Sequence, residues 1–290
     1  MAMQLSQLQV TTGRNPVYVR RGNHDDFWSG YGSGIWESDT RIVFNRFIDS
    51  QHSYIDIGAW IGPTLLLGCQ LAKRAYGIEP DPIAYTELVD NINYNLPLTS
   101  NVQLFNICIT SISGRIIFGS RGDGGDSMSS LLFSNEKTSW MVDGLNFQEW
   151  IEQNKINDCN FIKIDIEGGE YSVLPTMVAY LRNHRPTLHL SLHPCFLGEL
   201  AAQSMSARLK RSILRLGNTI RLLKMLKFYK YLYDPSGKIP RVGMSSSLRS
   251  RLHFRHRLAK VSLKPAVLLL VCLLSISGRT SALVLTDTKW

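Results

Sequence analysis

Segments typical of strands and helices alternate from Ser53 onward, and this alternation constrains the fold more than any other feature. The first unit, YIDIGAWIGPTLLLG, begins at Tyr54 as a short apolar run, passes an acid and two glycines, and continues into a leucine-rich stretch. Strands and helices that alternate at this length pack as a mostly parallel sheet covered by helices on both faces. We therefore predict an α/β fold whose ligand site lies beyond the carboxyl ends of the strands.

The individual elements are predicted from apolar periodicity and from turn residues. Strands are predicted at 53–58, 75–80, 101–110, 160–168, 186–194, 230–234 and 281–290. Helices are predicted at 39–47, 63–74, 81–95, 146–154 and 169–183. The glycine- and serine-rich stretch 119–131 is predicted to be a loop, and the aromatic residues 1–50 are predicted to form an N-terminal helical and loop cap.

The net charge of +9 is concentrated in residues 206–265, which contain sixteen Lys and Arg residues and one acid, Asp234. Apolar residues recur in this segment at helical intervals, at Leu209, Ile213, Leu216, Ile220 and Leu223. A helix with this pattern is predicted to bury its apolar stripe while its charges stay in solvent. The alternative is a surface that attracts anionic substrates, nucleic acid or lipid headgroups.

Cysteine spacing and hydropathy exclude several classes of protein. The five cysteines are scattered without a C-x-x-C pair, which indicates reduced thiols in a cytoplasmic protein rather than a disulfide framework or a zinc site. The first residues show no apolar core of a secretory signal. The most apolar run, 265–277, is shorter than the about 20 residues that span a bilayer, so it is predicted to be a buried helix, with membrane association as the alternative.

The turn DIGAWIG, residues 56–62, gives the first indication of a ligand. Its glycines are spaced G-x-x-x-G, so the G-x-G-x-x-G fingerprint of dinucleotide-binding proteins is absent. S-adenosylmethionine carries a sulfonium and no phosphate, so it does not require the phosphate-binding backbone of that fingerprint. The backbone of Gly58, Ala59 and Gly62 is predicted to pass close to the amino-acid part of this ligand. Asp56 is predicted to meet the ligand's ammonium, directly or through water.

A second acid supports this hypothesis. Glu79 ends the next predicted strand, where its carboxylate is predicted to accept hydrogen bonds from both ribose hydroxyls of the cofactor. The alternative interpretation is a tight structural turn with an acid at the start of a helix.

Five motifs in this order resemble the FkbM family of S-adenosylmethionine-dependent methyltransferases: YIDIGAWIGPT, YGIEPDPIAYTELVDNINYN, GDSMSSL, NFIKIDIEGGEYSVLP and LSLHP. The resemblance extends from about Trp36 to Phe196, and KYLYD and LTDTKW fit the family's last strands. It implies a Rossmann-like class I methyltransferase fold, with a seven-stranded, mostly parallel sheet whose last strand is antiparallel. It also implies methyl transfer, usually to an oxygen. Residues 51–290 would then form the methyltransferase domain, with 206–265 as a basic variable segment.

The motif DIEGGE places the carboxylates of Asp165, Glu167 and Glu170 at the carboxyl end of the fourth predicted strand. Asp165 is predicted to lie beside the cofactor and to orient or deprotonate the acceptor. Glu167 and Glu170 are predicted to contact the substrate, with capping of the next helix as their alternative role. His193 ends the fifth strand and is a second catalytic candidate, although a structural histidine is the alternative. No further metal ligand is recognisable, so no metal site is predicted.

The loop GDGGDSMSSL combines mobile glycines with the hydroxyls of Ser127, Ser129 and Ser130. It is predicted to close over acceptor and cofactor as a lid, with a plain surface loop as the alternative.

Together these features predict an enzyme that uses S-adenosylmethionine to methylate a hydroxyl of a sugar-containing or other small-molecule acceptor. One rival function is a nicotinamide-dependent oxidoreductase, which the missing third glycine disfavours. The other is a non-catalytic protein of the same fold that binds membranes or nucleic acid through the basic segment. No nucleic-acid partner is expected, and the sequence leaves the oligomeric state open.

Overall fold

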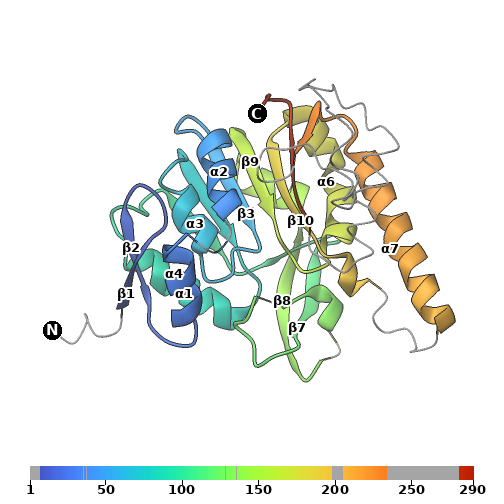
Figure 1. The fold of residues 1–290 in the computed structure, drawn as a ribbon, viewed down its shortest axis with the longest axis horizontal. Helices are drawn as coiled ribbons and strands as arrows, with labels where there is room; N and C mark the ends of the chain where they lie inside the picture. The colour runs from blue at the N-terminus through green and yellow to red at the C-terminus, as the bar shows by residue number, and fades with distance from the viewer. Residues whose placement is uncertain are drawn as a thin grey trace, which may run out of the picture.

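A seven-stranded sheet forms the centre of the described molecule (Figure 1). The computed structural model describes residues 7–34, 36, 38–127, 129–134, 136–197, 205–233 and 281–290. The helices within these ranges are α1 (Asp25–Gly32), α2 (Ser38–Phe47), α3 (Pro63–Gly68), α4 (Pro82–Asn93), α5 (Phe147–Gln153), α6 (Glu170–His184) and α7 (Met205–Met225). The strands are β1 (Gln7–Thr11), β2 (Pro16–Arg20), β3 (Ser53–Ile57), β4 (Arg74–Ile78), β5 (Val102–Phe105), β6 (Cys108–Thr110), β7 (Gly114–Ser120), β8 (Thr138–Asn146), β9 (Cys159–Ile164), β10 (Thr187–Leu192), β11 (Tyr231–Tyr233) and β12 (Ser281–Thr286).

The strand order of the central sheet is β11-β12-β10-β9-β3-β4-β5. The strands from β10 to β5 run parallel to one another, and β12 is antiparallel to both of its neighbours. This arrangement confirms the predicted mostly parallel sheet with an antiparallel last strand. Because parallel strands end at the same edge, the segments that follow β3, β4, β9 and β10 meet there.

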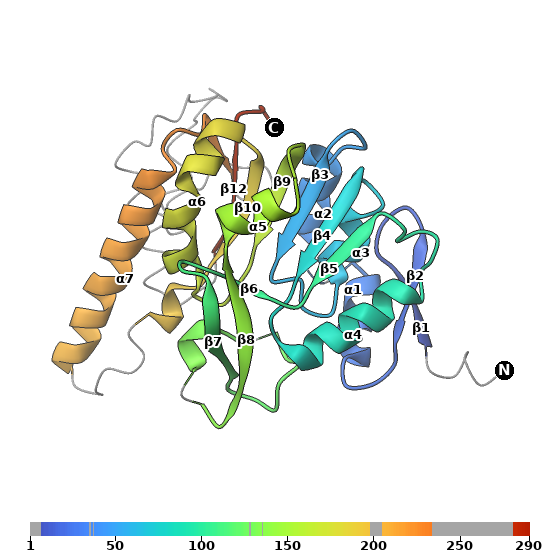
Figure 2. The same cartoon turned by 180° about the vertical axis from the view of Figure 1, so that it is seen from behind.

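Side chains of the central strands alternate between two apolar layers. Ile55 and Ile57 of β3 face the layer formed with α5, α6 and α7, whereas Tyr54 faces the layer formed with α1 to α4. Figures 1 and 2 show α7 as the outermost helix, lying beside α6 at the end of the molecule opposite to β1 and β2. Burial on both faces explains why the strand sequences are nearly continuous apolar runs.

The N-terminal residues form a β-hairpin, β1–β2, that the sequence analysis did not predict. The amide of Asn95, just beyond α4, accepts from the backbone N–H of Tyr18 (2.7 Å) and donates to its carbonyl (2.7 Å). Asn91 of α4 accepts from the N–H of Arg20 (2.6 Å). The hairpin is therefore held by side chains more than 70 positions away in the chain, and no local pattern reveals such contacts.

The prediction of one continuous strand at 101–110 is wrong, because the segment divides into β5 and β6. Between them, Asn106 donates its side-chain amide to the carbonyl oxygens of Glu79 (2.8 Å) and Pro80 (3.3 Å), and the chain leaves the central sheet. β6 then pairs with β8, and β8 with β7, in a three-stranded sheet that was not predicted. The glycine- and serine-rich loop connects β7 to β8.

The predicted helix at 63–74 is also too long, since α3 ends at Gly68. Asn101 donates its side-chain amide to the carbonyl oxygens of Cys69 (2.9 Å) and Ala72 (3.0 Å). These bonds satisfy carbonyls beyond the helix end, so a regular continuation is not required.

Helix α7 contains the apolar stripe predicted for the basic segment, and among its residues whose burial is described, the buried ones lie in the last turns. Leu223 is 1% exposed and packs with Leu222 and Leu226 against the layer that contains α6. Ile213 is 61% exposed, so the prediction that the whole stripe faces the core is wrong there. The remainder of the basic segment, 234–265, and the apolar run 265–277 lie outside the described residues.

Two further predictions concern membrane spans and thiols. Within the described ranges, no helix is long and apolar enough to cross a membrane. The described cysteines are free thiols, as predicted, and all but the last are buried: Cys69, Cys108, Cys159 and Cys195.

Gly58 lies where the ends of β3 and β9 touch. Its φ of +85° is in the left-handed region, and a Cβ there would lie 1.9 Å from the carbonyl oxygen of Asp165. We expect Gly58→Ala to lower the free energy of unfolding by about 2–4 kcal/mol, because the strand ends must separate and alanine disfavours this backbone.

Gly30→Ala is the matched control, because a Cβ on that α1 residue would meet nothing within 4 Å. It is expected to leave stability unchanged or to raise it by about 0.5–1 kcal/mol. Urea denaturation measures both variants, and equal stabilities would contradict the role given to Gly58.

Candidate active site

A cavity opens at the carboxyl edge of the sheet, where the segments after β3, β4 and β9 meet. Its volume, open mouth included, is about 980 Å³. The charged side chains that line it are Glu79, Asp126, Lys163, Asp165 and Glu167.

The predicted site residues divide into two groups around this cavity. Those that line it are Gly58, Ala59, Glu79, Ser127, Ser129, Asp165 and Glu167. Those that are not part of its wall are Asp56, Gly62, Ser130, Glu170 and His193. Of the second group, Ser130 and His193 contact members of the first group, namely Glu167 and Asp165.

Asp56 is fully buried beneath the cavity. Its Oδ2 accepts hydrogen bonds from the hydroxyls of Tyr54 (2.6 Å) and Thr64 (2.7 Å), and its Oδ1 accepts from Lys163 Nζ (3.2 Å). As a residue of β3 it faces the layer under α3, on the same side of the sheet as Tyr54. Asp56 does not line the cavity and holds Lys163 in place, so its predicted contact with a ligand ammonium, directly or through water, stays a prediction.

Lys163 is a site residue that the sequence analysis missed. Its ammonium donates to the carbonyl oxygen of Gly58 (3.2 Å) and lies 3.6 Å from Asp165 Oδ2, at the cavity wall. The side chain is only 6% exposed. A lysine inside the apolar strand sequence NFIKI was the available signal, because buried lysines require a partner.

The glycine turn serves packing in this structure. The N–H groups of Gly58 and Ala59 both donate to the carbonyl oxygen of Ile78 at the end of β4 (3.0 Å each). Gly62 has a φ of +99°, and a Cβ there would lie 2.8 Å from the side chain of Leu88. The glycines therefore allow chain segments to pack closely against one another. Gly58 and Ala59 also line the cavity.

Glu79 lies at the cavity wall directly after β4, as predicted. Its Oε2 accepts from the N–H of Trp60 (2.8 Å) and its Oε1 from the N–H of Asp81 (2.8 Å). Burial raises the pKa of Glu79 to about 8, although these two backbone donors work in the opposite direction. A carboxylate held in this way keeps one lone pair on each oxygen for a ligand.

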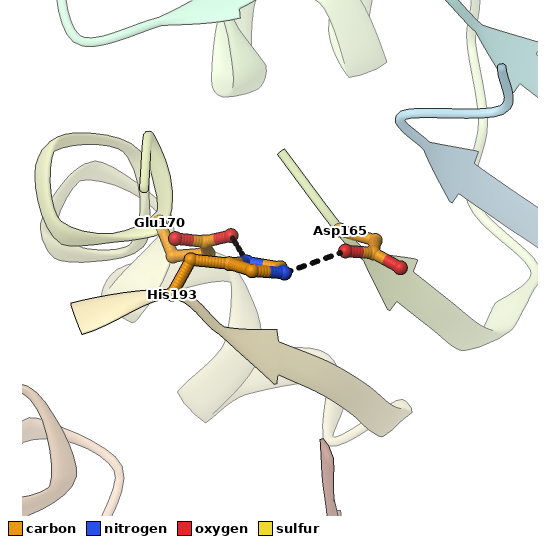
Figure 3. A group of neighbouring side chains, drawn as sticks. All are labelled: Asp165, Glu170 and His193. Atoms are coloured by element: carbon orange, nitrogen blue, oxygen red, sulfur yellow. Dashed lines mark hydrogen bonds and ion pairs between the residues drawn. The ribbon is translucent and has the colours of Figure 1, made fainter. Parts of the chain in front are cut away.

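Figure 3 shows His193 between Glu170 and Asp165. Nδ1 of His193 lies 2.9 Å from Glu170 Oε1, and Nε2 lies 3.5 Å from Asp165 Oδ1 and 3.5 Å from Glu167 Oε1. Burial lowers the pKa of His193, but the hydrogen bond and charge of Glu170, together with Asp165 and Glu167, outweigh it and raise the pKa to about 9. The imidazole is therefore cationic at neutral pH.

Donor atoms of Asp165, Glu170 and His193 lie within 4.8 Å of one another, a spacing that a metal site would also have. A histidine binds a metal through a nitrogen lone pair. Here Nδ1 of His193 is hydrogen-bonded to Glu170 Oε1. We interpret the three residues as a hydrogen-bonded ion-pair cluster.

Glu167 lines the cavity next to this cluster. Its backbone is left-handed, with φ of +50°, and the Ser130 hydroxyl donates to its carbonyl oxygen (2.8 Å). Burial is the largest influence on this carboxyl and raises its pKa to about 7, although the nearby charge of His193 lowers it.

The predicted lid is tied down at several of its described residues. Oδ2 of the buried Asp81 accepts from the N–H of Gly125 (2.9 Å) and from the hydroxyl of Ser129 (2.7 Å). Trp60 Nε1 donates to the carbonyl oxygen of Gly125 (2.8 Å). The hydroxyls of Ser129 and Ser130 therefore have structural partners, while Ser127 lies at the cavity wall.

An aromatic cluster that sequence analysis did not assign to the site forms another part of the wall. Phe27, Trp36 and Trp60 line the cavity, with ring centroids of Phe27 4.6 Å from Trp60 and 4.9 Å from Trp36. Two of the three come from the N-terminal segment that was predicted only as a cap.

The family of the chain follows from its sequence match. Residues 56–217, more than half of the chain, match the model of the methyltransferase FkbM domain. The chain belongs to the FkbM methyltransferase family. The matched residues include the glycine turn, Glu79, the DIEGGE motif and His193, so the predicted family and the methyltransferase activity are confirmed.

Solved structures give weaker likenesses. An FkbM methyltransferase from Methylobacillus flagellatus is 24% identical over 50% of this chain, with a TM-score of 0.36, and the chain spans 34% of that protein's length. A precorrin-8w decarboxylase from Methanobacterium thermoautotrophicum is 14% identical, covering 69% of this chain and 75% of its own, with a TM-score of 0.36. Precorrin-6y C5,15-methyltransferase from Geobacter metallireducens is 13% identical, covering 62% and 68%, with a TM-score of 0.32. Curated protein sequences yield no match.

Asp81 joins the N-terminus of α4 to the loop above the cavity, because its Oδ1 also accepts from the N–H of Ile83 (2.8 Å). We expect Asp81→Ala to lower the free energy of unfolding by about 2–3 kcal/mol, since a helix cap and a buried acceptor are both lost. Amide hydrogen exchange at Gly125 should accelerate at least about tenfold, because its acceptor is removed.

Ser129→Ala removes one of these bonds and leaves the cap intact, so it is expected to cost only about 1 kcal/mol. Unchanged exchange at Gly125 in Asp81→Ala would show that the loop is held by other contacts.

Proposed function

We propose that this methyltransferase takes its methyl group from S-adenosylmethionine and transfers it to a hydroxyl of a sugar-containing or other small-molecule acceptor. The observation that carries the proposal is the charge of the cavity. Among its described lining residues, four acidic side chains outnumber one basic side chain: Glu79, Asp126, Asp165 and Glu167 against Lys163. Such a wall favours a cationic ligand and opposes a pyrophosphate.

The residues present fit this cofactor and fit a dinucleotide poorly. Glu79 would hold the ribose hydroxyls with the lone pairs that its backbone donors leave free. Asp165 and Glu167 place negative charge at the wall near the turn of Gly58, where a sulfonium and an ammonium would be stabilised. The amides of Gly58 and Ala59 are bonded to Ile78, so they offer no cradle for phosphate.

When bound, S-adenosylmethionine supplies an electrophilic methyl group. The chain's own residues then position the partners and keep water away. Phe27, Trp36 and Trp60 provide an apolar wall, which limits competing hydrolysis and favours flat apolar faces such as those of sugar rings or phenols. A carboxylate at the wall accepts the proton that the hydroxyl loses.

A nucleic-acid acceptor is disfavoured by the same acidic lining, because phosphodiesters would be repelled from the mouth of the cavity. A cytoplasmic location stays a prediction, as does a methyltransferase domain at 51–290 behind an N-terminal cap at 1–50, and membrane association stays the alternative for the basic segment and the apolar run 265–277.

Calorimetry tests the cofactor. Wild-type protein should bind S-adenosylmethionine in the micromolar range, about −8 kcal/mol, and a nicotinamide dinucleotide should not bind. Glu79→Gln should weaken binding by about 1–3 kcal/mol, because a charged acceptor for hydroxyls is lost.

The pH dependence follows from the raised pKa of Glu79, about 8. The ribose hydroxyls need the ionised carboxylate, so affinity should increase from pH 6 to pH 8 and then level off, and Glu79→Gln should lose most of this increase. Asp143→Asn, an exposed residue paired with Arg115, is the control and should bind normally. Tight dinucleotide binding without binding of the sulfonium compound would contradict the assignment.

A transfer assay tests the acceptor. Protein incubated with methyl-deuterated S-adenosylmethionine and a panel of monosaccharides, phenols and hydroxy acids should give a product that is heavier by one deuterated methyl group. Parallel reactions with tRNA and a DNA oligonucleotide should stay unlabelled. Labelling confined to the nucleic acids would overturn the small-molecule proposal.

A further inference from the structure

We propose that Glu167 accepts the proton of the acceptor hydroxyl, and that His193, held by Glu170, is the positioning residue that keeps the Glu167 carboxylate at the cavity wall. This assignment rests on the proposed transfer to a hydroxyl. It differs from the sequence-based prediction, in which Asp165 or His193 was the base.

The geometry singles out Glu167 among the wall carboxylates next to the glycine turn. Its side chain lines the cavity and is 17% exposed. Its left-handed backbone is rarely adopted by a glutamate and is fixed from outside by the bond from Ser130. Gly168, with φ of +95°, continues the turn. Strained residues held in this way cluster at active sites.

Asp165 is less suited to accept a proton. Within the described chain it forms ion pairs on both sides, with Lys163 (3.6 Å) and with His193 (3.5 Å), whereas Glu167 forms one, with His193 (3.5 Å). Each oxygen of the Asp165 carboxylate therefore faces a cation, Oδ2 facing Lys163 and Oδ1 facing His193, whereas Glu167 meets one cation through Oε1. Asp165 is therefore assigned to orienting the acceptor and balancing Lys163.

His193 is unsuited for a different reason. It is 5% exposed and not part of the cavity wall, and both ring nitrogens face carboxylates. As a cation it has no lone pair with which to accept a proton. Its charge does, however, attract Glu167 to its observed position.

The proton transfer balances without a further reactant. As the hydroxyl oxygen forms its bond to the methyl carbon, the carbon–sulfur bond breaks and its electron pair stays on sulfur. The O–H bond breaks, its electron pair stays on oxygen, and the proton moves to the Glu167 carboxylate. Partial exposure then lets the proton leave to solvent. A base whose pKa lies close to 7 is well matched to this step.

Carbon NMR of protein labelled at the glutamate carboxyl carbon tests the ionisation directly and needs no acceptor. The charged groups around Glu167 are His193, Asp165, Glu170 and Lys163. The signal that disappears in Glu167→Gln should titrate with a midpoint near 7, and this midpoint should move upward in His193→Gln, because a stabilising cation is lost. A midpoint in the ordinary range of glutamate, near 4.5, or no upward movement, would overturn the proposal. Glu152→Gln, an exposed α5 residue, should leave this signal unchanged.

Turnover on the acceptor found in the panel gives the second readout. Wild-type turnover should rise about tenfold per pH unit below 7 and then level off. Glu167→Gln should be about 10²- to 10⁴-fold slower and lose this dependence, with cofactor affinity within about twofold of wild type. Glu167→Asp should recover part of the rate, and Glu152→Gln should match wild type.

The two proposals fail in different ways. Absence of S-adenosylmethionine binding by wild type would contradict the proposed function. Normal binding with near-normal turnover by Glu167→Gln, alongside a large loss in Asp165→Asn, would instead reassign the base to Asp165.

Discussion

The buried ion pair between Asp56 and Lys163 is the interaction on which the rest of the site depends. A charge buried alone in a protein core is strongly destabilising, so each member requires the other. The hydroxyls of Tyr54 and Thr64 and the carbonyl oxygen of Gly58 complete their hydrogen bonding. Because Asp56 lies on β3 and Lys163 on the adjacent β9, the pair joins the two strands whose ends form the floor of the cavity. Lys163 is thereby fixed at the wall.

From this pair, charges of alternating sign extend outward along the strand ends. Lys163 is followed by Asp165, Asp165 by His193, and His193 by Glu170 and Glu167. Each inner charge has opposite charges on two sides. Glu167 stands at one end of the series, with one cation beside it and a largely buried carboxyl. Burial raises the pKa of Glu167 to about 7, and the charge of His193 only partly offsets this effect.

Sequence reasoning located the parts of the site that depend on local order. Glu79 and His193 could be placed because each directly follows an apolar strand, and parallel strands end at one edge. The same rule did not predict the direction in which the Asp56 side chain points. Its neighbours suggested a residue of the turn, whereas the pleat of β3 points its side chain under α3, where Tyr54 and Thr64 supply donors. Lys163 was missed because its partner lies 107 positions away.

The loop between β7 and β8 has contacts that its composition does not reveal. Its glycines and serines suggest a free lid, but Asp81 accepts hydrogen bonds from Gly125 and Ser129 while it also caps α4. The same segment after β4 presents Glu79 to the cavity, and the amide of Asp81 is one of the donors that hold Glu79. Asp81 therefore contacts both Glu79 in the wall that would hold the ribose and the loop above that wall. A displacement of the loop would disturb Asp81, and through its amide it would alter the carboxylate that faces the ligand.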